Sequence, residues 1–368
     1  TNFYTYIEEP TRSELARTCH SKACKHQLKH VGLLMAVEQS HGIPLISRVY
    51  RANSHDSQLF SFVLTDLIIA LKRLCGADSD LVLVFDKGNN SQDNFSTLVG
   101  KVSWIGALVP SQYEELLDLD LSLYHGKWKE AQYYRCTRQI MGLECVVVLT
   151  FSMARKRKQE HCLRRGIEKL KRGVCKKWDS YKKVPKQITA GILTLQKKSA
   201  YGNCLQISVR DNKPHFIENE AKIAERKKRF GKNLIFSNML NAETGYLIDT
   251  YREKNIIEDD FRVLKDPMLI RFHPIRHWTD SKIRAYAFCC VVSMILVRVM
   301  QWKTEQAGYA MSPTVLKEEL SDIQEVVMLY SPREAERKIT ERSFVQSKLW
   351  NIFHLEEIQQ KLSLHEHN

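Results

Sequence analysis

The stretch Leu81-Val-Leu-Val-Phe85-Asp86 places a carboxylate directly after a short apolar run. A continuous run of branched and aromatic residues is typical of a strand buried on both faces of a sheet. In open α/β sheets, ligands bind beyond the carboxyl ends of the strands. The run therefore predicts an inner strand, with Asp86 at the edge where a functional site would form.

The residues that surround this run predict further strands and one helix. Residues 31–38 and 43–50 are apolar runs joined by His41-Gly42, which is a hairpin signal, and residues 2–7 predict a strand before them. Apolar side chains recur at helical spacing over residues 57–75, and residues 102–109 predict another strand. The order β-β-β-α-β-α-β, with an acid after the fourth strand, resembles the layout of a ribonuclease-H-like α/β core, a mixed sheet flanked by helices.

The character of the chain changes after residue 110. We interpret residues 1–110 as the first half of the core, 111–232 as an inserted β-rich and helical region, 233–310 as the second half, and 311–368 as a C-terminal helical segment. In the inserted region we expect a hairpin around Met141-Gly142 (residues 133–151) and short strands near 191–197, 204–210 and 214–218. In the second half of the core we expect a strand at 234–238 and a buried core helix over 281–302. In the C-terminal segment we expect a helix through Leu316, Leu320, Ile323, Val326 and Val327.

The charge balance favours a polyanionic partner. The net charge is +14 and the pI is near 9.2, which points to nucleic acid ahead of a membrane surface. Much of this charge lies in a predicted helix over residues 153–177. Its basic face is either a solvated surface or a DNA-contacting one, and the sequence leaves both open.

Several classes of protein and site are disfavoured. The longest charge-free apolar run near the C-terminus, residues 285–297, is shorter than the ~20 residues that span a bilayer, and the first residues do not resemble a signal peptide. Ten scattered cysteines indicate a reducing cytoplasm. A zinc site is disfavoured because no second cysteine pair with suitable spacing follows the group Cys19, His20, Cys24, His26 and His30.

A second acid stands out in the stretch Tyr251-Arg-Glu-Lys254-Asn-Ile-Ile-Glu258, which continues to Lys265. On one α-helix, Tyr251, Lys254, Glu258 and Lys265 would fall within a stripe roughly 60° wide. A carboxylate there can hold a hard divalent cation, and lysines can hold phosphate oxygens. The alternative is an exposed helix with ordinary ion pairs, in which Glu258 binds Lys254 or Arg262.

Asp86 also has an alternative role, because an Asp after a strand often caps the next helix. Asn89, Asn90 and Ser91 lie closer to that helix and could cap it, so Asp86 is expected to be available for another role. Two carboxylates at one end of a sheet could share Mg²⁺ (or Mn²⁺), and such ions support in-line attack on a phosphodiester. A centre of this kind normally uses a third carboxylate. Residues 1–7 contain none, and Glu38 and Asp56 do not occupy the expected place.

The pattern Tyr-x2-Lys-x3-Glu-x6-Lys resembles the Tyr-Arg-Glu-Lys signature of bacterial insertion-sequence transposases of the DDE type, in the insertion sequence four superfamily. Other segments resemble further parts of that family, and together the likeness covers most of residues 1–300: Thr1-Asn-Phe-Tyr4, His20-Ser-Lys22, Gly42-Ile-Pro-Leu45, Asn53-Ser-His-Asp56, Leu83-Val-Phe-Asp-Lys-Gly88 and Pro274-Ile-Arg-His-Trp-Thr-Asp280.

The resemblance implies catalytic, metal-binding roles for Asp86 and Glu258, the second and third acids of the triad. It implies DNA contacts for Tyr251, Lys254 and Lys265. Lys254 replaces the usual arginine, which keeps the charge but loses bidentate phosphate binding. The first Asp of the family usually lies two residues before the position of Thr1, so the chain is expected to be N-terminally truncated and catalytically incomplete.

The activity implied is Mg²⁺-dependent hydrolysis of double-stranded DNA at element ends, followed by strand transfer into target DNA. A homodimer in the synaptic complex and a place in the bacterial cytoplasm are also implied, without a membrane. Two alternatives stay open: a ribonuclease-H-like nuclease that cuts without joining, and a non-catalytic, DNA-binding transposase remnant.

Overall fold

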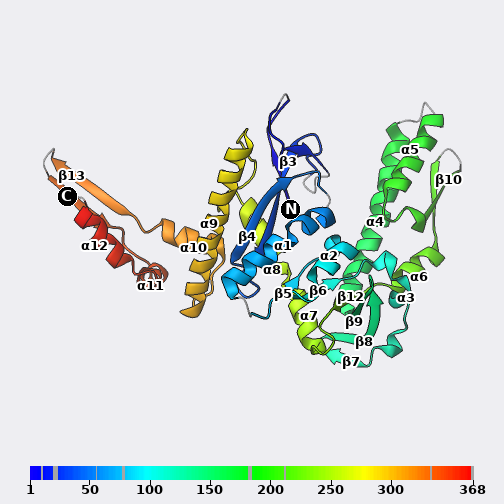
Figure 1. Ribbon diagram of the computed structural model, residues 1–368. Coiled ribbons are helices and arrows are strands. Elements are labelled where there is room, and N and C mark those ends of the chain that lie inside the picture. The colour runs from blue at the N-terminus through cyan, green and yellow to red at the C-terminus, as the bar shows by residue number, and fades with distance from the viewer. Residues whose placement is uncertain are drawn as a thin grey trace. The chain divides into compact units, whose positions relative to one another are not determined.

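The computed structural model divides the chain into two compact units, which we describe separately (Figure 1). Unit 1 comprises Thr1–Ser79 and Glu253–Asn368, and unit 2 comprises Asp80–Arg252. The structure describes residues 1–9, 11–19, 24–54, 56–76, 79–180, 185–210, 213–331 and 334–365. These boundaries do not coincide with the divisions expected at residues 110, 232 and 310.

Unit 1 is built on an antiparallel sheet in which β3 (Lys29–Val37) pairs with β1 (Asn2–Thr5), β2 (Arg17–Thr18) and β4 (Pro44–Arg51). The predicted β3–β4 hairpin is confirmed. Gly42 in its turn has a φ of 70°, in the left-handed region that glycine adopts without strain. A Cβ at Gly42 would also approach Asp260 Oδ1 at 3.0 Å, so the turn and the helix that carries Asp260 are closely packed.

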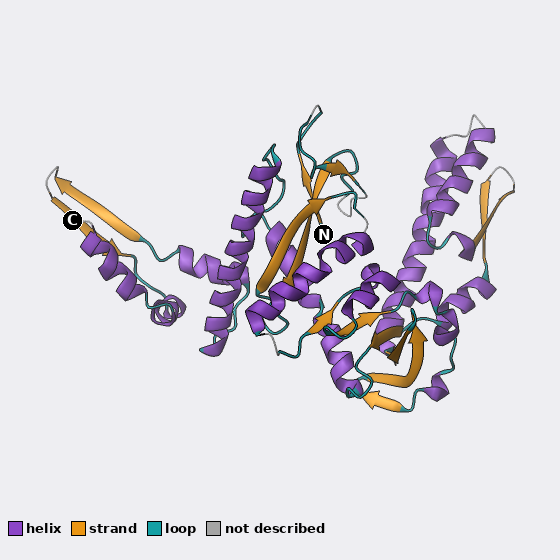
Figure 2. Cartoon of the chain, viewed as in Figure 1, coloured by secondary structure: helices purple, strands orange, loops and turns teal. Residues whose placement is uncertain are grey.

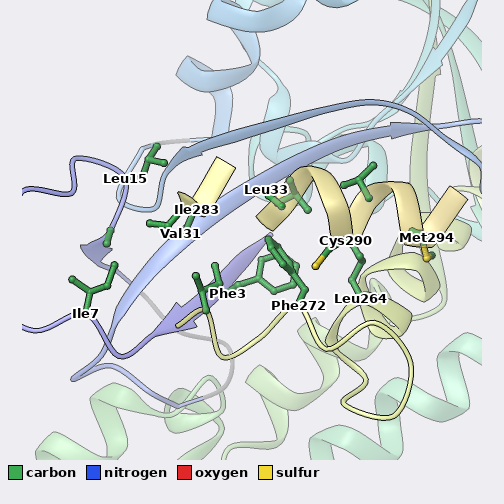
Figure 3. Packing of buried hydrophobic residues seen from close by; sticks show 14 residues of the cluster. Phe3, Ile7, Leu15, Val31, Leu33, Leu264, Phe272, Ile283, Cys290 and Met294 are labelled. Atoms are coloured by element: carbon green, nitrogen blue, oxygen red, sulfur yellow. The ribbon is translucent and has the colours of Figure 1, made fainter. Parts of the chain in front are cut away.

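Helices flank this sheet on both faces. Helices α8 (Asn255–Lys265) and α9 (Asp280–Gln306) cover the face that carries Phe3, Val31 and Leu33 (Figure 3). Helix α1 (Asp56–Cys75) contacts β4, and its residues line a shallow pocket with Leu34 and Ile46. Because Leu33 and Leu34 are adjacent in a strand, they point to opposite faces, so α1 lies on the other side of the sheet.

Helix α9 confirms the predicted long apolar helix but is not fully buried. Ile283, Cys290 and Met294 belong to the unit 1 core. The opposite side of α9 exposes Phe288 and Leu296, which are 67% and 58% accessible. By length and composition alone α9 could cross a membrane. Its packing against a sheet is that of a helix at the edge of a protein core.

The C-terminal part of unit 1 differs from the prediction. Helix α10 (Pro313–Ser321) is followed by a hairpin of β13 (Glu325–Ser331) and β14 (Glu334–Ile339), then by α11 (Phe344–Ile352) and α12 (Leu355–His365) (Figure 2). The expected helix through Val326 and Val327 is therefore wrong. These β-branched residues favour the extended conformation, and their apparent helical spacing with Leu316 and Leu320 spans two different elements.

Unit 2 is built on a six-stranded mixed sheet in the order β5-β6-β12-β9-β8-β7. The strands are β5 (Val82–Val84), β6 (Ser103–Ala107), β7 (Gly126–Trp128), β8 (Ala131–Ile140), β9 (Leu143–Phe151) and β12 (Lys232–Ser237). Strands β5 and β6 are parallel, and the other pairs are antiparallel. The predicted strands and the hairpin around Met141-Gly142 are confirmed.

The prediction for the strand before Asp86 is wrong in one respect. Strand β5 stands at the end of the sheet order, and all three of its residues are partly exposed, so it is not an inner strand buried on both faces. Its hydrogen-bonded partner among the described strands is β6, whereas β1 belongs to the other sheet. The apolar residues of β5 are therefore only partly buried, in a strand at the edge of the sheet.

Helices also flank the unit 2 sheet. Phe95 of α2 (Gln92–Leu98) packs against Trp104 and Phe236 on one face. Helix α7 (Thr244–Glu253) covers the other face, where Ile105 joins its core cluster. The short elements of this unit are α3 (Glu114–Leu117) and four single-turn 3₁₀ helices: η1 (Lys87–Asn89), η2 (Pro110–Gln112), η3 (Leu121–Leu123) and η4 (Gly202–Cys204).

A further part of unit 2 has its own apolar core. It consists of α4 (Met153–Ser180), α5 (Pro185–Lys198), α6 (Glu220–Lys228) and the hairpin of β10 (Leu205–Arg210) with β11 (Lys213–Glu218). The basic helix and these two strands confirm the predictions. The strand expected at 191–197 is wrong, because Ile192 and Leu195 lie one helical turn apart on α5 and pack together into this core.

Candidate functional site

Glu258 lies in the first turn of α8, with its side chain exposed. The helix is fixed in unit 1 because Leu264 is buried in the core and Phe261 packs beside it. The alternative of ordinary ion pairs does not apply to Glu258. Arg262 binds Asp259 at 2.9 Å instead, and within the described part of the chain no salt bridge involves Glu258. Its carboxylate is therefore open to a ligand from solvent.

The single helix expected to carry Tyr251, Lys254, Glu258 and Lys265 is a wrong prediction. Helix α7 ends at Glu253 and α8 begins at Asn255, with Lys254 between them as the N-cap. Tyr251 is only 7% exposed and packs in the core of unit 2. Burying its ring under the sheet removes apolar area from water, which an exposed stripe would not do. Of the four residues, only Glu258 and Lys265 share one helix, two turns apart.

Lys265 lies beside the first strand of unit 1. Its Nζ is 5.2 Å from the ring centroid of Phe3, and it contributes, after burial, to lowering the pKa of His273. The His273 ring is in turn 4.9 Å from that of Tyr4. Lys265 therefore places its ammonium group against the ring of Phe3 in β1.

Asp86 is exposed directly after β5, as the sequence predicted. Its Oδ1 accepts a hydrogen bond from the Lys87 backbone N–H at 2.9 Å and so caps the turn η1. The cap of the next helix, α2, is Ser91, whose hydroxyl accepts from Asn94 N–H at 3.2 Å. The expectation that Ser91 relieves Asp86 of capping α2 is thus confirmed, although Asp86 orders a shorter turn.

The two acids belong to different units, Asp86 to unit 2 and Glu258 to unit 1. Each is therefore described in its own surroundings. Among the described residues, no group of three or more His, Cys, Asp or Glu side chains is arranged to hold a metal ion. Of the disfavoured zinc group, His20 lies outside the described residues, and Cys19 Sγ accepts a hydrogen bond from Asn2 Nδ2 at 3.3 Å.

The sequence did not reveal a buried ion pair next to Glu258. Asp260 is fully buried, and its Oδ1 accepts from Arg298 Nε at 2.8 Å. Its Oδ2 has no hydrogen-bond partner. Burial raises the pKa of Asp260 to about 6, with Arg298 opposing the shift. The acid-rich start of α8 was visible in the sequence, but no local pattern connects Asp260 with a residue on α9.

The basic helix α4 has two distinct sides. Its buried side faces the apolar core and consists of Leu163, Ile167, Leu170, Val174 and Trp178. Its exposed side carries lysines and arginines along its length. The two sides are separated because apolar residues recur at intervals of three and four, which keeps them on one side of a helix.

The chain was compared with known proteins at three levels. It matches no family model, no curated protein and no solved structure.

Proposed function

We propose that this chain is the catalytic portion of a DDE-type DNA transposase with a ribonuclease-H-like core. The observation that carries the proposal is Glu258 in the pattern Tyr-x2-Lys-x3-Glu-x6-Lys, on a helix where its carboxylate is exposed and makes no salt bridge in the described part of the chain. An exposed carboxylate outside the described ion pairs is accessible to a metal ion, and the sequence pattern around Glu258 is what assigns it that role in the proposal.

The proposed fold is supported by the order and pairing of the elements. Strands β1, β3 and β4 form an antiparallel set, α1 follows, and β5 and β6 are parallel. A ribonuclease-H-like core would require β5 to join the same sheet as β1.

The donor groups suit magnesium. Asp86 and Glu258 offer exposed carboxylate oxygens, the hard ligands that Mg²⁺ prefers. With a third acid, a bound metal would lower the pKa of the attacking water or 3′-hydroxyl and stabilise the leaving oxygen. Among the residues of this chain, the carboxylates of Asp86 and Glu258 are proposed to hold the metal ion. Lys254 and Lys265 are proposed to hold phosphate oxygens of the DNA. Hydrolysis at the element end leaves a 3′-hydroxyl. This hydroxyl would then attack a phosphorus atom of the target strand, so that a new P–O bond forms and the target's own 3′-oxygen leaves as a hydroxyl.

The test uses the full-length gene product and DNA that carries the ends of its element. We expect Asp86→Ala and Glu258→Gln each to abolish Mg²⁺-dependent cleavage, while DNA binding persists. The matched controls are Asp93→Asn and Asp259→Asn, which remove an exposed acid close to each site in sequence and should leave cleavage unchanged. Unchanged cleavage in either Asp86→Ala or Glu258→Gln would remove that residue from the proposed site.

Two alternatives give different products. A nuclease without joining activity would cut the ends but yield no strand-transfer product, and Glu258→Gln would still abolish the cut. A DNA-binding remnant would also account for the net charge of +14. It would bind the ends without cutting them at any Mg²⁺ concentration.

A further inference from the structure

The net charge of the protein is concentrated in helix α4. Its 28 residues contain eleven lysines and arginines against three acids, so that this helix carries +8 of the chain's +14. The helix is also well fixed, since its apolar side is buried against α5, β10 and α6. The question is whether its charge only keeps the surface solvated or serves to bind a ligand.

Five of these cations form one straight row on the helix, which we call the α4 row: Lys158, Arg165, Lys169, Arg172 and Lys176. All five are exposed. Their spacing of 7, 4, 3 and 4 residues confines them to a stripe roughly 60° wide. The middle of this stripe lies about 170° around the helix from the middle of the buried side, so the row faces solvent along a rise of about 27 Å.

The α4 row lacks the acids that a merely solvated face would contain. Arg165/Lys169 and Arg172/Lys176 are like-charge neighbours at i,i+4, each of which destabilises a helix by roughly 0.2–0.5 kcal/mol. Acids do neutralise the flank of α4, where Lys171 binds Glu168 at 3.1 Å and Glu218 at 2.7 Å. Within the described residues, no salt bridge involves a member of the row. Glu168 lies within one turn of Arg165 and Arg172, but its carboxylate binds Lys171, so no described ion pair offsets the repulsion within the row.

We propose that the α4 row binds the phosphate backbone of duplex DNA, without regard to base sequence. Its length of about 27 Å approaches the ~34 Å of one turn of a duplex, along which phosphates are closely spaced. Binding would replace the repulsion within the row by contacts to phosphate. This inference deepens the proposed function by naming a DNA-binding surface, yet it requires no catalytic activity.

A membrane surface fits the α4 row less well. Helices that lie in the membrane interface combine a basic side with Trp, Phe or Leu side chains that insert between lipids. The large apolar residues of α4, including Leu163 and Trp178, are instead buried in the protein core. The α4 row therefore lacks the exposed apolar side chains that would insert between lipids.

The experiment compares two triple variants of the full chain with the same change of charge. Arg165→Gln/Lys169→Gln/Arg172→Gln removes the centre of the row. Lys101→Gln/Lys127→Gln/Arg138→Gln removes three exposed cations elsewhere in unit 2. Binding of a random-sequence duplex about three turns long is measured by fluorescence anisotropy in EDTA, from about 50 to 200 mM salt. Circular dichroism checks that both variants are folded.

We expect the row variant to lose at least about tenfold in affinity and to lower the slope of log K against log salt by about 3, since each phosphate contact contributes roughly 0.9. The control should change the affinity less than about threefold and leave the slope as in the parent. Equal losses in both variants, or an unchanged slope in the row variant, would overturn the proposal. So would a loss of binding to phosphatidylserine vesicles while DNA binding is retained. Because EDTA prevents metal-dependent cleavage, these outcomes are independent of the test of Asp86 and Glu258.

Discussion

Helices α8 and α4 are both charged and amphipathic, but they use their charges in opposite ways. Helix α8 buries Asp260 against Arg298 and exposes Glu258 two residues earlier. Helix α4 buries only apolar residues over most of its length and exposes its cations in the α4 row. The difference separates charges that hold the fold together from charges that are open to a ligand. We assign the Asp260–Arg298 pair to the first kind, and Glu258 and the α4 row to the second.

The largest expected effect concerns the buried pair of α8. Replacing Arg298 with methionine leaves the Asp260 carboxylate buried without its partner, and breaking such a pair typically destabilises a protein by about 3–5 kcal/mol. We expect Arg298→Met to lower the free energy of unfolding of unit 1 by this amount, measured by urea denaturation at pH 7.

Arg262→Met is the matched control, because its 79% exposed side chain forms an i,i+3 pair with Asp259. Such pairs contribute only about 0.2–0.5 kcal/mol. Similar losses in the two variants would show that burial does not distinguish the charges of α8.

The next effect is a dependence of stability on pH. The pKa of Asp260 is about 6 in the folded protein against a reference of 3.8, so the folded state binds more protons than the unfolded state between these values. Below pH 4, ionisation of Asp260 therefore does not lower the free energy of unfolding. Above pH 6, the full reduction in the free energy of unfolding is present. A shift of two units corresponds to about 3 kcal/mol.

We expect the free energy of unfolding of the wild type to fall relative to Asp260→Asn as the pH rises from about 4 to about 6.5. Denaturation curves of both proteins across this range measure the difference. Asp66→Asn, which changes an exposed carboxylate on α1 of the same unit, should instead follow the wild-type curve. A constant difference between wild type and Asp260→Asn would contradict the raised pKa.

The smallest effect concerns the α4 row. Lys169→Glu places an acid between Arg165 and Arg172, so that two repulsive contacts become attractive. Each pair loses roughly 0.2–0.5 kcal/mol of repulsion and gains a similar attraction, so we expect unit 2 to become more stable by about 0.8–2 kcal/mol. Urea denaturation at low salt measures the gain, while DNA affinity should fall. A loss of stability would mean that the repulsion within the row is already compensated.

The features that local sequence determines were predicted well. The hairpin of β8 and β9 follows from Met141-Gly142, which adopt φ values of 50° and 83°, and from the strand-forming runs on either side. The apolar spacing of α4 and α9 also gave the correct helices. The position of Asp86 just beyond the end of a strand was also predicted from the apolar run before it.

The errors arise where distant packing decides. Tyr251 is drawn into the unit 2 core, so the expected single helix ends before Lys254. Strand β5 stands at the end of the sheet order although its composition resembles that of an inner strand. The Asp260–Arg298 pair joins residues 38 positions apart, and neither has a local pattern that marks it. Such features depend on which elements meet, and single-sequence periodicity does not contain that information.

Metal binding tests the central claim, that Asp86 and Glu258 hold one divalent cation together. In the full-length protein, bound Mn²⁺ can be counted by electron paramagnetic resonance for the parent, Asp86→Asn, Glu258→Gln and the double variant. A shared site predicts that each single variant loses the bound ion nearly as completely as the double variant, because the two residues act on one ligand and their effects do not add. Mn²⁺ binding that survives in either single variant at the parent's affinity would contradict the claim.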